Sequence, residues 1–222
     1  MSEETPGLAT VKPYLVSSAR SYAIVVAIAF LVGLVNAFNE GLGIFLLLCG
    51  LPFLTILLLT FLIVWFVRGV RLAKQYERFW VKAVGVLASP VLLAAAMFLV
   101  WPSLIVGGRL GDLARLALNQ RHYEAIIAKA RRDHKASWYE EDGGVTYSVD
   151  LGPPIRVAFN PAGMLDNWSG IIFDPTGVVM TADGFDPVTG KFRAPEAVTK
   201  LFGGDLVSCR HLWGSYYSCA FT

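Results

Sequence analysis

Charged residues are scarce in this sequence. Asp, Glu, Lys and Arg make up 16% of its 222 residues, whereas apolar residues make up 55%. A soluble globular protein normally has about 25% charged residues, so the composition argues against a wholly soluble chain. The formal net charge of +2 is too small to indicate a nucleic-acid-binding surface. We therefore expect no nucleic acid among its partners.

The few charges are unevenly distributed along the chain. Residues 1–106 contain only seven of the 19 basic residues and four of the 17 acidic ones. Most of the charge therefore belongs to residues 107–222, which also contain the strand-like segments described below. The sequence predicts a membrane half followed by a water-facing half.

Three uncharged apolar stretches predict three transmembrane helices, at about residues 22–39, 42–67 and 84–106. At 1.5 Å per residue, each is long enough to cross about 30 Å of hydrocarbon, the first with little to spare. Pro52 and Pro90 fall inside two of these stretches. Because proline removes a backbone donor, we expect a kink at each.

The first stretch has an alternative interpretation as a cleaved signal peptide, because basic residues precede it. Two features oppose this interpretation. The segment ahead of the stretch is long for the start of a signal peptide, and residues 35–38 lack a convincing small-x-small cleavage site. We therefore treat residues 22–39 as a retained span.

No Asp, Glu, Lys, Arg or His falls inside the three predicted spans. Pumps and many ion-coupled transporters depend on buried ionisable groups, so this absence argues against a chain that transports by itself. The polar residues Asn36, Thr55, Thr60 and Ser89 remain as candidates for hydrogen bonds between helices.

The loops predict an orientation. Residues 68–82 contain five basic residues and a single acid, Glu77, whereas the first connection at residues 39–40 contains no basic residue. The positive-inside rule therefore places residues 68–82 in the cytoplasm of a bacterium, together with an N-terminal segment, residues 1–21. Everything after residue 106 is then expected on the periplasmic or extracellular side of the inner (plasma) membrane.

The basic residues of this loop recur at spacings of three and four, which would place them on one face if the second helix continued out of the bilayer. Such a stripe would dock on anionic lipid head groups, and membrane lipids are accordingly among the expected partners. The alternative is that these residues serve only as a topology signal. The stripe consists of Arg68, Arg71, Lys74, Arg78 and Lys82.

The water-facing half is expected to be a small α+β domain. Residues 107–135 have helical apolar spacing and predict an amphipathic helix, which either binds lipid or a partner or packs on a sheet. Residues 136–222 predict an antiparallel β-sheet with hairpins. Turn clusters at 174–177 and 185–190 suggest two similar hairpins. The predicted strands are 145–151, 155–160, 169–173, 178–181, 206–212 and 216–221.

The three cysteines are not equivalent. Cys49 lies in the second predicted span, where a thiol resists ionisation. Cys209 and Cys219 would lie opposite each other in the last hairpin if residues 213–215 formed a three-residue turn. We therefore predict a disulfide between them, which is also expected only outside the reducing cytosol. Two isolated buried thiols are the alternative.

The sequence lacks common signatures of catalysis and cofactor binding. The glycine loop at 184–191 has the wrong spacing for a phosphate loop. The three histidines are dispersed, and no cysteine pair has the CxxC spacing of a zinc site. Ser208 and His211 would point to opposite faces of one strand. We therefore expect no cofactor and assign no catalytic, cofactor-binding or metal-binding residue.

Aromatic residues of the β domain are candidates for a binding surface, because Trp and Tyr are enriched at interface hot spots. The alternative is that most of them form the core of so small a domain. The partner-binding candidates are Asp166, Trp168, Trp213, Tyr216 and Tyr217, and Trp138 and Tyr139 are further candidates for exposed aromatics.

These observations predict a non-enzymatic inner-membrane protein that presents a periplasmic domain to another envelope protein or to a second copy of itself. It would be an accessory subunit of a membrane complex or a toxin-immunity protein. One alternative is an envelope or lipid enzyme that uses Asp166, Asp205 or His211. A second alternative is a small transporter subunit.

Overall fold

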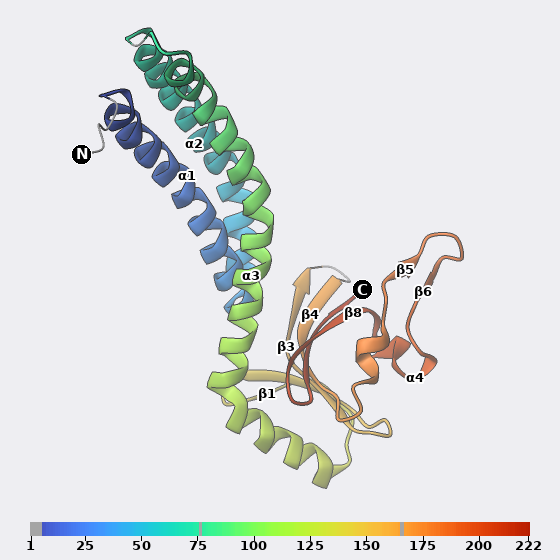
Figure 1. The fold of residues 1–222 in the computed structure, drawn as a ribbon. Helices are drawn as coiled ribbons and strands as arrows, with labels where there is room; N and C mark the ends of the chain where they lie inside the picture. The colour runs from blue at the N-terminus through green and yellow to red at the C-terminus, as the bar shows by residue number, and fades with distance from the viewer. Residues whose placement is uncertain (1–5, 76, 165–166) are drawn as a thin grey trace, which may run out of the picture. The chain divides into compact units, whose positions relative to one another are not determined.

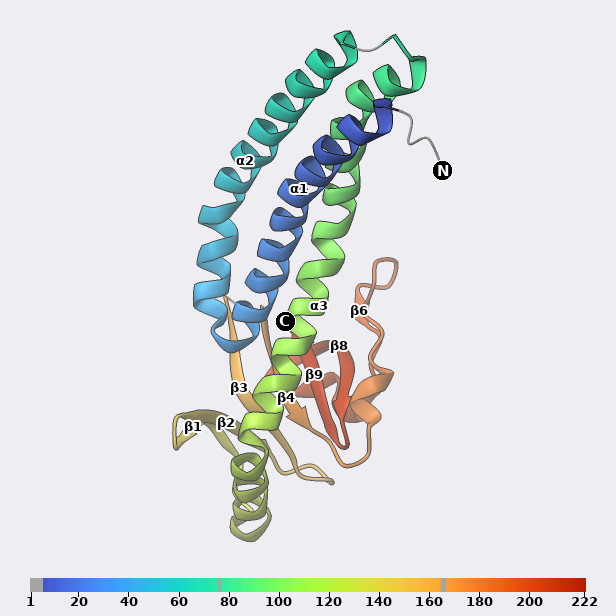
Figure 2. The same cartoon turned by 60° about the vertical axis from the view of Figure 1, so that its left-hand side comes forward.

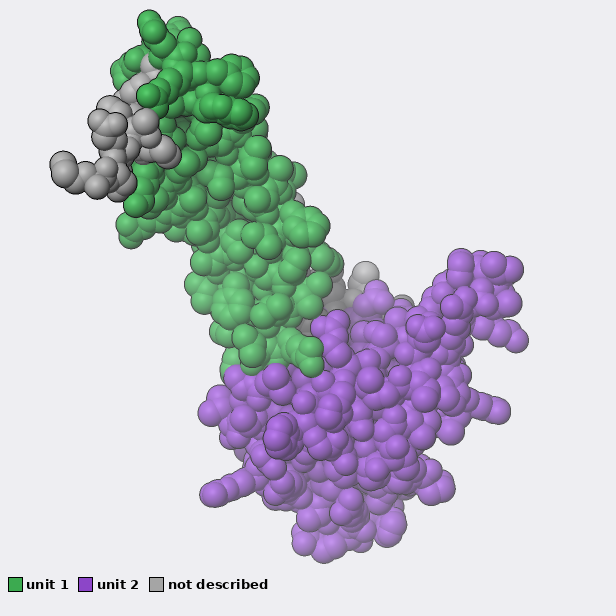
Figure 3. Space-filling model, viewed as in Figure 1, with its two compact units in different colours: residues 1–111 green, residues 112–222 purple. Residues whose placement is uncertain are grey.

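The computed structural model describes residues 6–75, 77–164 and 167–222 (Figure 1). The chain divides into two compact units, Met1–Gly111 and Asp112–Thr222 (Figure 3). The first unit consists of helices and the second is mainly a β-sheet. The long third helix contributes to both units, so each of its two parts is described with the unit to which it belongs.

Three long apolar helices form the first unit: α1 (Pro6–Phe38), α2 (Glu40–Lys74) and the first part of α3 (Phe79–Asp133). Each contains a stretch long and apolar enough to cross a membrane. The predicted combination of three apolar helices and an antiparallel β domain is confirmed. The chain thus has the three candidate spans of a multi-pass membrane protein.

The helix boundaries differ from those predicted. Helix α1 begins at Pro6, ahead of the first predicted span at residues 22–39, so residues 6–21 belong to the same helix as that span. The predicted span at residues 84–106 and the predicted amphipathic helix at 107–135 are one helix, because α3 continues through Gly107 and Gly108 without a break. The reason lies in the packing of these glycines against α1.

Small residues let α1 and α3 approach closely. A Cβ atom at Gly33 would lie 2.2 Å from the carbonyl oxygen of Leu104, and one at Gly107 would lie 2.1 Å from that of Phe30. Gly111 follows Gly107 by four residues and faces α1 in the same way. Membrane helices associate by such close backbone packing. These glycines are therefore contact points between helices rather than helix ends.

Hydrogen bonds also connect the helices of this unit. Tyr22 Oη and Ser89 Oγ are 2.9 Å apart and buried. Tyr14 Oη donates to the carbonyl oxygens of Trp65 at 3.0 Å and Gly85 at 3.2 Å, so it joins α1 to both other helices. Ser89 thus forms the interhelical hydrogen bond predicted for it, and the tyrosine hydroxyls provide others.

The second unit contains a seven-stranded antiparallel sheet in the order β1-β2-β3-β4-β9-β8-β7 (Figures 1 and 2). A separate two-stranded hairpin consists of β5 (Phe185–Asp186) and β6 (Lys191–Phe192). The strands of the main sheet are β1 (Ser137–Asp142), β2 (Val145–Asp150), β3 (Arg156–Met164), β4 (Asn167–Phe173), β7 (Lys200–Leu201), β8 (Gly204–Trp213) and β9 (Tyr216–Phe221).

Both faces of this sheet are covered. The part of α3 after Asp112 packs on one face, where the Tyr123 ring stacks on Phe159 with centroids 4.0 Å apart. The segment between β4 and β8 covers the other face with Val179, Val198 and Leu201, all buried. The amphipathic stretch predicted at 107–135 therefore uses its apolar face for packing on the sheet, which is the second of its two interpretations.

The structure corrects the prediction for residues 178–181, which form the 3-10 helix η1 (Val178–Thr181) and not a strand. Asp174 causes this turn, because its carboxylate accepts the backbone N–H groups of Thr176 at 3.1 Å and Val179 at 3.2 Å. Gly177 supplies the left-handed conformation with φ 72°. The turn at 174–177 is thus no hairpin, whereas the one at 185–190 is, between β5 and β6. The short helix α4 (Glu196–Thr199) follows.

The last hairpin contains the predicted disulfide. Cys209 on β8 pairs with Cys219 on β9, and their sulfur atoms are bonded. The turn is shorter than predicted, since Trp213 pairs directly with Tyr216 and leaves Gly214 and Ser215 as a two-residue turn. An irregularity between His211 and Trp213 restores the register.

Candidate functional site

Strand β1 places two aromatic side chains at the surface. Trp138 is 54% exposed and Tyr139 is 53% exposed. Tyr139 has φ 56°, a left-handed conformation that is unusual for a bulky residue. The register of β1 against β2 shifts at this point, between Ser137 and Glu140. The strand therefore bulges where it presents these two rings.

Hydrogen bonds fix the conformation of Tyr139. Its backbone N–H donates to Ser148 Oγ at 3.1 Å, and its hydroxyl donates to the carbonyl oxygen of Pro161 at 2.8 Å. One of these bonds reaches β2 and the other reaches β3. Because both backbone and side chain are held, Tyr139 is exposed without being free to rotate. Outliers of this kind are common at functional sites, where the surrounding structure holds the strain.

Trp168 on β4 extends the group. Its ring stacks on Phe221 with centroids 3.9 Å apart and planes at 4°, and its edge meets Trp138 at 6.3 Å and 80°. A Cβ at Gly204 would lie 2.8 Å from Trp168 Nε1, so glycine is needed beneath the ring. Trp168 is half-buried. We call Trp138, Tyr139 and Trp168 the aromatic surface.

The aromatic surface joins strands that are not neighbours. In the sheet order, β2 and β3 separate β1 from β4, yet Trp138 of β1 touches Trp168 of β4. The sheet therefore curls. Register shifts on β1 and on β3, between Phe159 and Ala162, lie in the strands that curl. Sequence patterns predict strands but not this curl, and so they do not bring Trp138 and Trp168 together.

Acidic residues follow the aromatic surface along β1. Glu140, Glu141 and Asp142 complete the strand, which is one of the two edge strands of the sheet. Glu140 Oε2 accepts a hydrogen bond from Tyr147 Oη at 2.6 Å, which fixes one of the carboxylates. The surface thus combines exposed rings with negative charge at a sheet edge.

The structure divides the predicted partner-binding residues. Trp213 is 70% exposed but pairs with Tyr216 at the opposite end of β9 from Phe221, on which Trp168 stacks. Tyr216 and Tyr217 are buried, one in each core, because successive residues of a strand point to opposite faces and both faces of this sheet are covered. They are core residues and not surface candidates. Asp166 lies outside the described residues.

The burial of Tyr216 has an electrostatic consequence. Removal from water disfavours the phenolate, and burial together with the nearby Glu124 and Tyr123 raises the pKa of Tyr216 to about 12. The side chain is therefore neutral at physiological pH. It packs beside Phe173 with ring centroids 5.5 Å apart and fills the core beneath α3.

Asp205 and His211, which the enzyme hypothesis would use, each have a hydrogen-bond partner elsewhere. His211 Nε2 is 2.9 Å from the carbonyl oxygen of Gly214, and Asp205 accepts from Lys200 Nζ at 2.8 Å. Ser218 Oγ donates instead to Asp112 at 2.8 Å. Within the described residues, no three His, Cys, Asp or Glu side chains gather as a metal site requires.

Asp112 belongs to a polar contact between α3 and the sheet. Burial raises the pKa of its carboxyl group, and this effect outweighs the hydrogen bond from Ser218 and the charges of Arg115 and Arg210, which oppose it. Arg115 Nη2 lies 3.6 Å from Asp112 Oδ1. Local sequence patterns do not indicate this contact, because Asp112 and Ser218 are more than a hundred residues apart in the chain.

The basic residues at 68–82 do not form a single stripe. Helix α2 ends at Lys74, and α3 begins at Phe79, so the chain turns between them. Arg68 lies over the Trp65 ring at 4.9 Å, whereas Lys82 belongs to the other helix. The prediction assumed a continuous helix, but α2 ends at Lys74 and α3 begins at Phe79, so the basic residues do not share one helix face.

Comparisons with known proteins add no identification. No protein-family model matches the sequence, and neither the curated proteins nor the solved structures compared with it include a match.

Proposed function

We propose that this chain is a non-enzymatic protein of a bacterial inner (plasma) membrane that presents its second unit to another envelope protein in the periplasm. It would act as an accessory subunit of a membrane complex or as a toxin-immunity protein. The observation that carries this proposal is the aromatic surface of Trp138, Tyr139 and Trp168.

The energetics of these side chains favour a binding role. Trp138 and Tyr139 leave about half of their surface in water, and covering large rings is a major source of binding free energy. Tyr139 is already held by two hydrogen bonds. Little side-chain freedom is then lost on association, which favours affinity.

The charges next to this surface indicate which charges the partner would carry. Glu140, Glu141 and Asp142 lie beside the rings on an edge strand. A complementary partner would therefore offer an apolar area flanked by basic residues. We expect added salt to slow the association of the two proteins. Salt should affect the strength of the apolar contact less.

Two independent features support a periplasmic location. The disulfide between Cys209 and Cys219 is a bond that the reducing cytosol disfavours. The basic residues at 68–82 favour a cytoplasmic loop, and with three spans the second unit would then lie on the other side of the membrane.

Affinity purification of the full chain from gently solubilised membranes tests the proposal. We expect a partner in stoichiometric amount with the native chain and its loss with Trp138→Ala. Trp213→Ala is the matched control, because it removes an even more exposed tryptophan, which pairs with Tyr216 at the opposite end of β9 from Phe221. Differently tagged copies in the same cells reveal whether the partner is a second copy.

Two results would contradict the proposal. One is purification of the native chain alone after mild crosslinking in intact cells. The other is equal partner recovery with Trp138→Ala and Trp213→Ala.

A further inference from the structure

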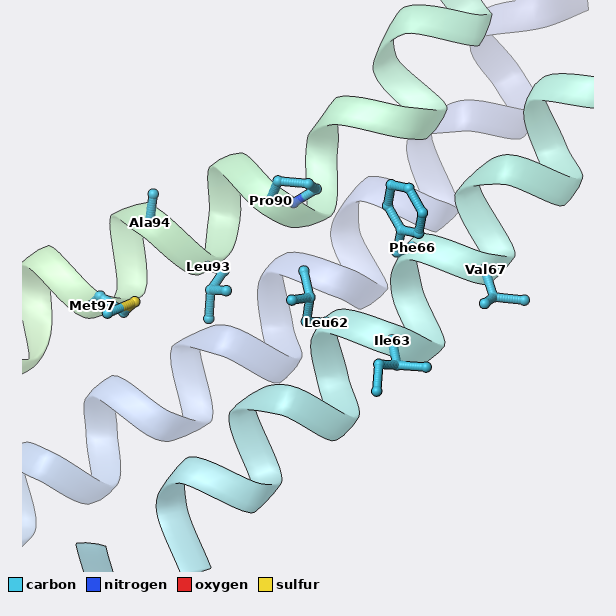
Figure 4. A pocket seen from close by; sticks show the side chains of 8 residues that line it. All are labelled: Leu62, Ile63, Phe66, Val67, Pro90, Leu93, Ala94 and Met97. Atoms are coloured by element: carbon cyan, nitrogen blue, oxygen red, sulfur yellow. The ribbon is translucent and has the colours of Figure 1, made fainter. Parts of the chain in front are cut away.

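Helices α2 and α3 enclose an apolar groove of about 450 Å³ in the first unit (Figure 4). Leu62 and Phe66 of α2 and Leu93 of α3 project into the gap between the two helices. All eight lining side chains are apolar, and none is small apart from Ala94. They are Leu62, Ile63, Phe66, Val67, Pro90, Leu93, Ala94 and Met97.

Two lysines lie beyond one end of this groove. Lys74 follows Val67 by seven residues on α2, and Lys82 precedes Pro90 by eight residues on α3. At 1.5 Å per residue, both lie about 10–12 Å past the groove along their helices. Because Lys74 is the last residue of α2 and Lys82 lies in the first turn of α3, both are at the same end of the helix pair. Both side chains are exposed.

This separation matches the dimensions of a lipid. Beyond the hydrocarbon of a bilayer, the polar region extends about 5–8 Å on each side, and a lysine side chain can reach along the helix towards it. A molecule with an acyl chain in the groove would therefore place its phosphate near Lys74 and Lys82. Residues 68–82 carry five basic groups against one acid, Glu77, so a negatively charged head group is favoured.

A helix from another protein fits this groove less well. Membrane helices pack through small residues, and in this unit Gly33, Gly107 and Gly111 already form the contact between α1 and α3. The walls of the groove are instead bulky Leu, Ile, Phe and Met side chains. A flexible chain fills such an irregular space more readily than a rigid helix does.

We propose that α2 and α3 form a binding site for one anionic phospholipid of the bilayer. An acyl chain occupies the groove, and Lys74 and Lys82 hold the phosphate. This site is independent of the aromatic surface, so failure of one proposal leaves the other untouched.

Arg68 provides a control for charge. It is on the same helix end as Lys74 but lies over the Trp65 ring at 4.9 Å, and it is six residues from Lys74, which places it on a different side of the helix. Arg68→Gln therefore removes a positive charge from this end of the helix without altering the side of the helix that carries Lys74. Ala94 and Ala95 allow a matched test of added side-chain volume. Both are exposed, but only Ala94 lines the groove.

Native mass spectrometry of the full chain, titrated with phosphatidylglycerol or phosphatidylcholine in detergent, tests the site. We expect one saturable phosphatidylglycerol per chain and much weaker retention of phosphatidylcholine. Lys74→Gln with Lys82→Gln should weaken phosphatidylglycerol binding about 25-fold, taking about fivefold for each lysine, whereas Arg68→Gln should leave it nearly unchanged. Ala94→Phe should displace the lipid and Ala95→Phe should not.

Equal binding of the two lipids would overturn the proposal. So would an equal loss with Arg68→Gln, because it would show that total charge and not the site governs binding. Unchanged binding in Ala94→Phe would show that the groove does not hold the acyl chain, and this would contradict the proposed site.

Discussion

Cys209 lies directly opposite Cys219 and is bonded to it, although the turn between them holds two residues instead of three. A two-residue turn alone would shift the pairing by one. The irregularity between His211 and Trp213 adds the missing residue to β8, so that Cys209 again faces Cys219. The disulfide therefore depends on a bulge as well as on sequence spacing.

Breaking this bond should destabilise the second unit. In the loop-entropy description, a ring of this size contributes about 2.5–3 kcal/mol, and losing a native bridge in a small domain typically costs about 2–5 kcal/mol. The double variant Cys209→Ser, Cys219→Ser should therefore unfold its second unit at a lower urea concentration than the unsubstituted chain, when both are measured as full chains. When the unsubstituted chain is denatured, maleimide should label one thiol, Cys49, before reduction and three thiols after it. Three labelled thiols before reduction would refute the bridge in the cell.

The proposed orientation predicts the result of fusions to the full chain. Alkaline phosphatase fused after Thr222 should be active, and a fluorescent protein that matures only in the cytosol should be dark there. Fusions near Gln75, at the end of α2, should give the opposite results. Cytosolic fluorescence at both positions would rule out an odd number of membrane crossings between them.

The close contact of α1 and α3 predicts an effect of volume at Gly33. Gly33→Val places atoms where the carbonyl of Leu104 lies, since a Cβ alone would be 2.2 Å from that oxygen. Overpacking of this kind costs about 1–3 kcal/mol. The control is Gly50→Val, because a Cβ at Gly50 meets nothing within 4 Å. Thermal aggregation in detergent should begin at a lower temperature for Gly33→Val than for Gly50→Val; equal temperatures would contradict the contact.

An ion pair buried in the second unit predicts a dependence of stability on pH. Arg156 Nε lies 3.2 Å from Asp174 Oδ1, and both side chains are buried. Burial by itself would raise the pKa of Asp174, but hydrogen bonds from Thr176 and Val179 and the charge of Arg156 outweigh it and lower the pKa below its usual value of 3.8. Because the folded-state pKa is the lower one, this stabilisation is present above pH 3.8 and is lost as the pH falls through the folded value.

Asp174→Asn should therefore lower the free energy of unfolding near neutral pH by about 3–5 kcal/mol, since it leaves the buried Arg156 without a charged partner. The difference from the native chain should shrink below about pH 4. Urea unfolding followed by tryptophan fluorescence at several pH values measures it. A difference that stays constant down to pH 3 would show that the carboxylate charge does not contribute.

The parts of the fold that could be predicted are those that depend on local composition. Uncharged length is sufficient to identify three membrane helices, and apolar alternation identifies strands such as β2 and β9. The edge strand β1 was missed because Glu140, Glu141 and Asp142 give it the composition of a loop. Its position at the margin of the sheet tolerates these charges.

Other features depend on contacts that sequence reasoning did not assemble. Val178 to Thr181 has strand-like residues, but the carboxylate of Asp174 and the left-handed Gly177 turn it into a 3-10 helix. The contact of Trp138 with Trp168 requires the curl of the sheet. One signal was available and not used, because the four-residue spacing of Gly107 and Gly111 is the usual mark of close helix packing in membranes.

The connection between α1 and α2 has a consequence for biogenesis. Asn39 alone separates the two helices, and its side chain accepts the backbone N–H of Leu42 at 2.9 Å, so the second helix is capped as the first one ends. A linker of one residue is too short for the first helix to insert into the bilayer while the second remains outside it. We expect the insertion machinery to receive these two helices as a single hairpin. The far side of the membrane should then display no segment between them for a protease or an antibody to reach.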